Sequence, residues 1–166
     1  MEKKIALLAL LTVVFVNTSG QVSFEDKLKS LYRNSVPLIH AEELKTLLKK
    51  NEGIILLDTR ALEEYNVSHI HNAHFIDYKK FRAQSVDSIK RNTPIVVYCT
   101  VGYRSERIGE QLMNLGFTNI RNLYGGIFDW VNKGNGVVDS SGNPTKQVHT
   151  YNKHWSQWLS KGVIVY

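Results

Sequence analysis

The sequence predicts an α/β fold: a doubly wound, mainly parallel five-stranded sheet with helices on both faces. Short apolar, β-branched runs alternate along the chain with segments whose apolar residues recur at helical spacing, which is typical of successive β-α units. The runs at 54–57 and 95–98 are apolar at every position. Strands covered on both faces of a parallel sheet have this composition, so we expect helices above and below the sheet.

The first half of the chain supplies three of the expected strands. Ser23 to Asp26 fits a capping box and predicts the start of a helix. We then expect strands at 36–39, 54–57 and 73–76, a helix at 41–50, a short helix through Leu62 and Tyr65, and a less regular polar segment at 79–92.

The second half supplies the other two strands. We expect a strand at 95–98, and after it a helix that carries Ile108 and Leu112 and closes at Gly116. A strand at 119–123 follows, and Gly125-Gly126 opens a helical turn that ends at Trp130. Parallel strands bind ligands at their carboxyl ends, where both Asp58 and Cys99 fall.

The N-terminus has the layout of a secretory signal peptide at 1–20. A charged start is followed by an apolar run at 5–16 and by small residues up to Gly20, after which we expect cleavage. The run is too short to span a membrane as a stable helix, so we expect an exported, periplasmic or secreted protein without stable membrane insertion after cleavage; an uncleaved anchor is the weaker alternative.

The remaining chain divides into a helical lead-in at 21–35, one domain at 36–133 and an extension at 134–166. Val137-Val138 fits one arm of a hairpin. Tyr151, Trp155, Trp158 and Leu159 fall on one helical face, which we expect to pack on the domain rather than to serve as a docking surface.

Charge excludes some partners. The chain carries 21 Lys and Arg against 15 Asp and Glu, a net charge of +6, but the basic residues are scattered. Because no dense basic run is present, we do not expect nucleic-acid binding, and the charge favours small anionic molecules.

Cys99 is the only cysteine, so an internal disulfide is excluded and its thiol is either inert or reactive. It stands at a strand-to-helix turn that contains Gly102 and Arg104. The unpaired amides of the helix N-terminus, a nest of loop N–H groups, and the charges of Arg104 and Arg107 are expected to stabilise a thiolate and to attract an anionic substrate. The alternative is a small buried core residue.

Three blocks of sequence resemble the single-domain rhodaneses, which are sulfurtransferases, and the resemblance covers about 36–133. The blocks are 55–60 with Glu64-Tyr65 and His69-Ile70, then 99–105, then 123–126 with Trp130. The family usually has Gly-His-Ile-Pro-Gly-Ala where this chain has Ser68-His69-Ile70-His71-Asn72-Ala73, which puts the shape of that turn in question.

The resemblance implies that Cys99 takes a sulfur atom from thiosulfate or a persulfide and passes it to cyanide, a thiol or a partner protein. Loop residues Thr100, Val101, Gly102 and Tyr103 would stabilise the charged sulfur, and Arg104 would orient the anionic donor. Supporting roles fall to Asp58, Arg60 and Ser105, and no metal or organic cofactor is needed.

Two other functions stay open. The protein could be a sulfur carrier or an anion-binding module for a partner, with little free turnover. A cysteine-dependent phosphatase or an arsenate-handling enzyme is a minor alternative, because the related phosphatases have five residues between Cys and Arg, whereas four separate Cys99 from Arg104. We expect His69, His71 and His74 to be unrelated histidines rather than metal ligands, and Tyr103 and Tyr98 either line the mouth of the site or only pack.

Overall fold

The computed structural model describes residues 22–166, so the predicted signal peptide lies outside the described residues. The lead-in contains α1 (Phe24–Leu31). The domain contains β1 (Leu38–Ile39), α2 (Ala41–Lys49), β2 (Ile55–Asp58), α3 (Leu62–Val67), β3 (His74–Phe75), the 3-10 turn η1 (Ala83–Val86), β4 (Ile95–Tyr98), α4 (Tyr103–Asn114), β5 (Ile120–Leu123) and α5 (Gly126–Asn132). The C-terminal extension adds β6 (Val137–Val138), β7 (Pro144–Thr145), β8 (Gln147–His149), α6 (Lys153–Ser156) and β9 (Val163–Val165).

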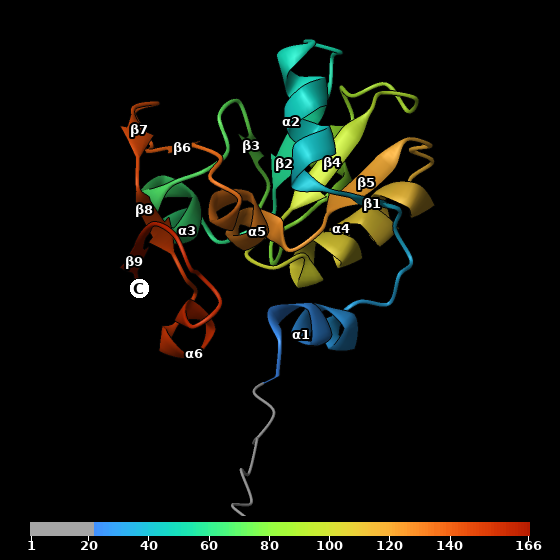
Figure 1. The fold of residues 1–166 in the computed structure, drawn as a ribbon. Helices are drawn as coiled ribbons and strands as arrows, with labels where there is room; N and C mark the ends of the chain where they lie inside the picture. Colours follow the sequence, from blue (N-terminus) through green and yellow to red (C-terminus); the bar gives the residue numbers. More distant parts are fainter. Residues whose placement is uncertain (1–21) are drawn as a thin grey trace, which may run out of the picture.

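The central sheet has five strands in the order β1-β5-β4-β2-β3, and every neighbouring pair is parallel (Figure 1). In the register of the two central strands, Leu57 pairs with Val97 and Asp58 with Tyr98. Asp58 and Cys99, which follows Tyr98, therefore lie at the same carboxyl edge. The predicted doubly wound fold is confirmed.

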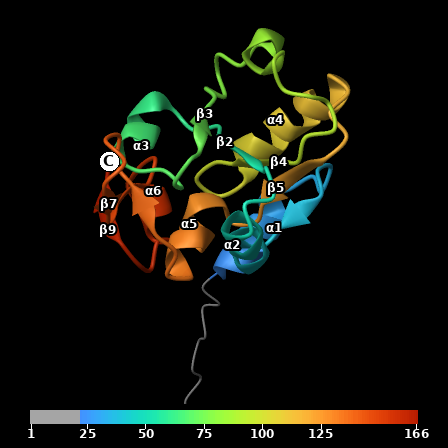
Figure 2. The same cartoon turned by 90° about the horizontal axis from the view of Figure 1, so that it is seen from above.

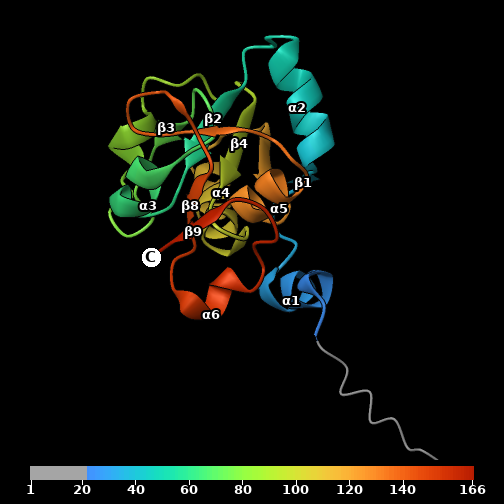
Figure 3. The same cartoon turned by 60° about the vertical axis from the view of Figure 1, so that its left-hand side comes forward.

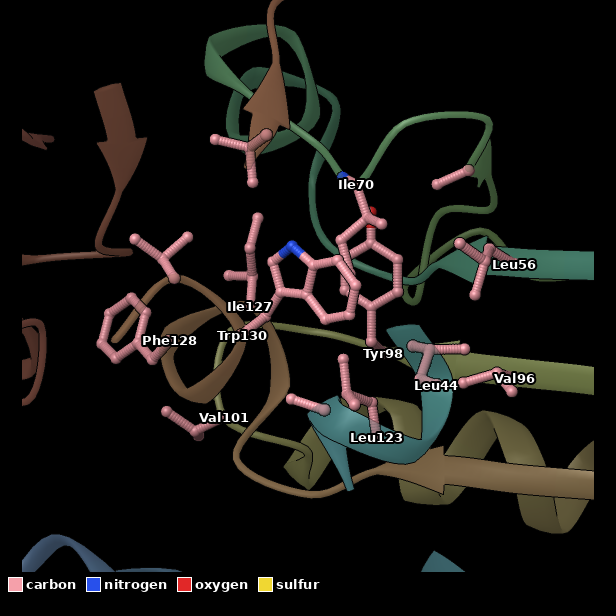
Figure 4. Packing of buried hydrophobic residues seen from close by; sticks show 14 of the residues in the cluster. Leu44, Leu56, Ile70, Val96, Tyr98, Val101, Leu123, Ile127, Phe128 and Trp130 are labelled. Atoms are coloured by element: carbon pink, nitrogen blue, oxygen red, sulfur yellow. Dashed lines mark hydrogen bonds between the residues drawn. The ribbon is translucent and has the colours of Figure 1, made fainter. Parts of the chain in front are cut away.

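Two apolar cores cover the two faces of the sheet. Side chains alternate between faces along a strand, so Leu56 and Val96 belong to one core with α2 and α5, whereas Leu57 and Val97 belong to the other with α4. Figure 2 shows α4 on one side of the sheet and α2 and α5 on the other. Figure 4 shows the first core, in which Trp130 lies beside Tyr98.

The two ends of the described chain pack against each other. The ring of Phe24 in α1 stacks on Trp158 with centroids 5.6 Å apart, and the ammonium of Lys27 lies 5.4 Å from the centroid of Trp155. Figure 3 shows α1 and α6 next to each other. Val148 and Leu159 of the extension are buried in the first core. The extension therefore lies against the domain and against α1.

The helix expected around Tyr151 to Leu159 is much shorter than its apolar spacing predicts. Asn152 begins it, because its side chain accepts hydrogen bonds from the N–H groups of His154 and Trp155, and only Lys153–Ser156 is helical. Tyr151 precedes this cap with a φ of 65°, which an L-residue in a right-handed helix does not adopt. Of these apolar residues, Tyr151 is thus left exposed at the surface.

Within residues 22–166, every helix is too short or too polar to cross a membrane.

Candidate active site

Cys99 directly follows β4, and the chain turns back around its sulfur. The Sγ atom accepts a hydrogen bond from the backbone N–H of Gly102 at 3.2 Å, and the side chain is almost fully buried. Gly102 has a φ of 95° and is the N-cap residue directly before α4. This left-handed conformation, which favours glycine, lets the chain pass from the loop around the sulfur into α4.

A tyrosine from the N-terminal lead-in connects the loop to the start of α5. The Tyr32 hydroxyl donates to the carbonyl of Val101 at 2.7 Å and accepts from the N–H of Gly125 at 2.8 Å. A Cβ atom on Gly102 would lie 2.1 Å from the Tyr32 oxygen, so the glycine is required for packing as well as for its φ. Tyr32 was not among the residues that the sequence pointed to.

A buried hydrogen-bonded pair holds the other side of the loop. The Ser105 hydroxyl donates to Oδ1 of Asn122 at 2.7 Å, and Nδ2 of Asn122 donates to the carbonyl of Gly102 at 3.0 Å. Ser105, expected to be a supporting residue, therefore acts on the loop through an asparagine on β5 that sequence reasoning missed. The sequence of β5 gives no clear signal for Asn122, because Arg121 beside it is also polar although only partly buried.

The start of α5 contacts the backbone of Cys99 directly. Ile127 and Phe128 donate their N–H groups to the carbonyls of Cys99 and Thr100, at 2.9 and 3.2 Å. A Cβ atom on Gly126 would lie 2.3 Å from the Cys99 carbonyl oxygen. Glycine is therefore the residue that lets this helix approach the loop closely.

Arg104 is locked into an ion pair with Glu64 of α3. Its two terminal nitrogens donate to the two carboxylate oxygens at 2.7 and 2.8 Å, and one of them also donates to the Thr100 hydroxyl. That hydroxyl donates in turn to Glu64 at 2.9 Å. The three side chains form a closed, mostly buried network directly beside Cys99.

The charge of Arg104 is thus compensated within the fold. Burial raises the pKa of Glu64, but the hydrogen bonds and charge of Arg104 outweigh burial and lower that pKa to about 2. For Arg104, burial lowers the pKa, while the hydrogen bond to Glu64 and the nearby Cys99 sulfur reverse this and raise it. The sequence places Glu64 in a family-like block but does not indicate this ion pair. Oε2 of Glu64 also accepts the N–H of Ala61 at 3.0 Å.

Arg107 does not supply the free positive charge expected of it. Its guanidinium pairs with the buried carboxylate of Glu106 and lies 4.0 Å from the centroid of the Tyr103 ring. Glu106 also accepts the backbone N–H groups of Arg33 and Ser35, so Arg107 serves the junction with the lead-in. The two arginines expected to place positive charge near Cys99 are therefore each paired with a glutamate. Partial positive charge at Cys99 comes from the loop amides and the start of α4.

Asp58 and Arg60 form a fully buried ion pair beneath the site. Arg60 donates from Nε and Nη2 to the carboxylate at 3.0 and 2.6 Å, and also to the carbonyl of Ser68. The pair therefore fixes the connection between β2 and β3 and does not face the pocket. Asn72, where the family usually has glycine, has a φ of 62°, a left-handed conformation that asparagine tolerates better than most residues.

The histidines of this segment do not converge. His69 stacks on Tyr65 with ring centroids 3.9 Å apart, and its Nδ1 lies 3.1 Å from the Tyr65 carbonyl. Among residues 22–166, no three His, Cys, Asp or Glu side chains come together as a metal site would require.

Cys99 lies at the base of an open pocket of about 490 Å³. Thr100, Val101 and Arg104 share the base, and the walls are formed by Leu31, Tyr78, Lys79, Tyr103, Tyr151 and Trp155. Tyr98, the other tyrosine considered for the mouth, is fully buried, and its hydroxyl accepts the N–H of Ile70. A cavity of about 710 Å³ beside β3 is larger, but Cys99 does not line it, so the candidate active site is the smaller pocket that contains the thiol.

Comparison with known proteins covers the same part of the chain. The family model described as "Rhodanese-like domain" matches residues 40–133. A tRNA uridine(34) hydroxylase of Wigglesworthia glossinidia brevipalpis is 34% identical over 105 residues, which are 60% of this chain and 33% of that protein. The putative sulfur carrier protein YrkF of Bacillus subtilis is 28% identical over 119 residues, covering 72% of this chain and 60% of that protein.

A shorter relative and a solved structure match the same region. The thiosulfate sulfurtransferase GlpE of Coxiella burnetii is 30% identical over 83 residues, which are 50% of this chain and 77% of that protein. A rhodanese-related protein of Thermoplasma volcanium has a TM-score of 0.55 at 30% identity, covering 61% of this chain and 97% of that one. The chain spans only 33% and 60% of the hydroxylase and the carrier, respectively.

Proposed function

Because the chain belongs to the rhodanese-like domain family, we propose that it is a sulfurtransferase that moves a sulfane sulfur from thiosulfate or a persulfide to a thiophilic acceptor through a persulfide on Cys99. One observation carries this proposal. The Cys99 sulfur lies at the base of an open pocket, inside a loop whose Gly102 N–H points at it. A nucleophile next to fixed N–H dipoles is suited to accepting and stabilising one additional anionic sulfur.

The reaction has two balanced steps. In the first, the Cys99 thiolate attacks the outer sulfur of thiosulfate, the S–S bond of thiosulfate breaks, and sulfite leaves with the electron pair, so Cys99 carries a persulfide anion. In the second, cyanide attacks the outer sulfur of that persulfide, thiocyanate leaves, and the thiolate is restored. No external oxidant, reductant or cofactor is required by this balance.

The surrounding residues keep the loop in one shape through both steps. Arg104 holds the Thr100 hydroxyl and Glu64 together, while Tyr32 and Asn122 hold the carbonyls of Val101 and Gly102. With these carbonyls held, the Gly102 N–H stays directed at the Cys99 sulfur. Fixed dipoles of this kind stabilise developing charge without reorganising during the reaction.

A sulfur carrier is the second candidate, and one relative is itself named a putative sulfur carrier protein. A carrier would form the same persulfide but would turn over slowly with cyanide in the absence of a protein partner. A phosphatase would instead hydrolyse phosphate esters.

We further propose that the protein acts outside the cytoplasm, because residues 1–20 have the layout of a secretory signal peptide. Separating cells into cytoplasmic and exported fractions, and detecting the protein in each fraction, tests this location.

The central test compares the wild-type protein with Cys99→Ser. We expect thiosulfate to add one sulfur atom to the wild-type protein, observed by intact-mass measurement and removed by a thiol reductant. We expect the serine variant to gain none and to form no thiocyanate. Equal thiocyanate production by the variant would disprove the assignment. Loading without steady-state turnover would favour the carrier, and hydrolysis of a phosphate ester without loading would favour the phosphatase.

A further inference from the structure

The pocket above Cys99 is much larger than an inorganic sulfur donor. Its volume of about 490 Å³ lies within the range of about 300 to 1,000 Å³ that holds organic ligands. Thiosulfate is a single sulfur bonded to a sulfonate group and would leave most of this space to water. Whatever is bonded to the transferred sulfur must lie in the pocket, because Cys99 is at its base.

The walls of the pocket are mainly aromatic and apolar. Tyr78, Tyr103, Tyr151 and Trp155 surround the opening together with Leu31, and the Tyr103 and Tyr151 side chains keep 41% and 54% exposure. Three of these wall residues lie outside residues 40–133, the part that matches the family model: Leu31, Tyr151 and Trp155. The character of the wall is therefore a property of this chain's lead-in and extension.

Charge in the pocket is largely compensated. The Arg104 guanidinium is paired with Glu64, which makes it a poor site for a doubly charged anion. Lys79 at the rim forms no ion pair with another side chain in the described part of the chain. An apolar group with a singly charged reacting end matches this distribution better than a small, strongly hydrated dianion.

Tyr151 is held in a defined position at the opening. Its backbone N–H donates to Nδ1 of His149 at 3.0 Å, and its φ of 65° turns the chain there. The guanidinium of Arg104 lies 5.3 Å from the centroid of the Tyr151 ring. The ring is thus positioned over the base of the pocket, where it can contact a group attached to the reacting sulfur.

We propose that the preferred sulfur donors are organic, persulfides or thiosulfonates with an aryl or similar apolar group, and that this group lies against Tyr151 and Trp155. Tyr151 is then a specificity-determining residue of the site. This inference rests on the proposed sulfurtransferase function. With a thiosulfonate, the Cys99 thiolate attacks the outer sulfur, the S–S bond breaks, and the organic sulfinate leaves with the electron pair.

Two donors that differ only in the apolar group provide the test: benzenethiosulfonate and methanethiosulfonate, with cyanide as the acceptor. For each protein, the ratio of their kcat/KM values is measured, which cancels the intrinsic difference in reactivity between the donors when variants are compared. Tyr151→Asn removes the ring and keeps a residue that tolerates positive φ. Tyr151→Phe keeps the ring, and Tyr166→Ala removes an exposed tyrosine of the same extension that does not line the pocket.

We expect the ratio to fall about threefold to tenfold in Tyr151→Asn, the range of one aromatic contact. It should be preserved in Tyr151→Phe and in Tyr166→Ala. An unchanged ratio in Tyr151→Asn, or an equal fall in Tyr166→Ala, would overturn the inference about the donor. If the same proteins still turned over thiosulfate, the proposed sulfurtransferase function would stand. If no donor, thiosulfate included, adds sulfur to Cys99, both proposals are wrong.

Discussion

The buried contact between Glu64 and Arg104 allows the sharpest quantitative prediction. Glu64→Gln keeps the shape of the side chain but removes its charge, as protonation would. Glu64 is only 2% exposed, and its carboxylate takes part in three side-chain hydrogen bonds, two from Arg104 and one from Thr100. We expect the variant to leave Arg104 buried and uncompensated, and therefore to destabilise the folded protein at neutral pH.

The size of the effect follows from the pKa. The pKa of Glu64 falls from its ordinary 4.5 to about 2, and each unit of pKa corresponds to about 1.36 kcal/mol, so the ionised carboxylate stabilises the fold by about 3 kcal/mol. Removing one partner of a buried ion pair typically costs about 3 to 5 kcal/mol, which agrees. Because folding lowers the pKa of Glu64, its ionised carboxylate stabilises the fold fully above about pH 4.5. This stabilisation is lost as the pH falls to about 2.

Urea denaturation of the wild-type protein and of Glu64→Gln, at several pH values between 7 and 2, measures how much the carboxylate stabilises the fold. The difference in the free energy of unfolding should be about 3 kcal/mol at pH 7 and should shrink toward zero near pH 2. Glu43→Gln is the matched control, because Glu43 also pairs with an arginine at 2.7 Å, but on the surface. That control should cost no more than about 1 kcal/mol. A difference that did not change with pH, or one no larger than in the control, would refute the reasoning.

Two further substitutions test how the loop is held. Tyr32→Phe leaves the Val101 carbonyl and the Gly125 N–H without their shared partner. We expect the free energy of unfolding, measured by urea denaturation, to fall by about 1 to 3 kcal/mol, and thiosulfate to load Cys99 more slowly. Full stability with unchanged loading would argue against this role. Gly126→Ala places a methyl group 2.3 Å from the Cys99 carbonyl oxygen. We expect its thermal unfolding midpoint to lie well below that of the control Gly136→Ala, where no atom lies within 4 Å of the added carbon. Equal midpoints would show that α5 can move away from the loop.

Much of the fold was predictable because it depends on local pattern. Apolar runs at 54–57 and 95–98 indicate strands covered on both faces, and helical spacing after Cys99 indicates α4. The same reasoning overestimated the helix around Tyr151, since spacing alone does not reveal that Asn152 caps a short helix after a residue with positive φ. Local hydrogen bonds decided that boundary against the apolar pattern.

The sequence by itself determined the nucleophile and its loop: one cysteine, at the end of a buried strand, with glycine and arginine at a fixed separation along the chain. Only the tertiary structure decided what surrounds them. Glu64, Tyr32 and Asn122 reach the loop from α3, the lead-in and β5, and Tyr151 and Trp155 reach the pocket from the extension. Contacts between residues so distant along the chain leave no periodic signal, because they depend on how elements pack rather than on how each one forms. Cys99 could therefore be found from the sequence, whereas the compensation of Arg104 and the aromatic wall could not.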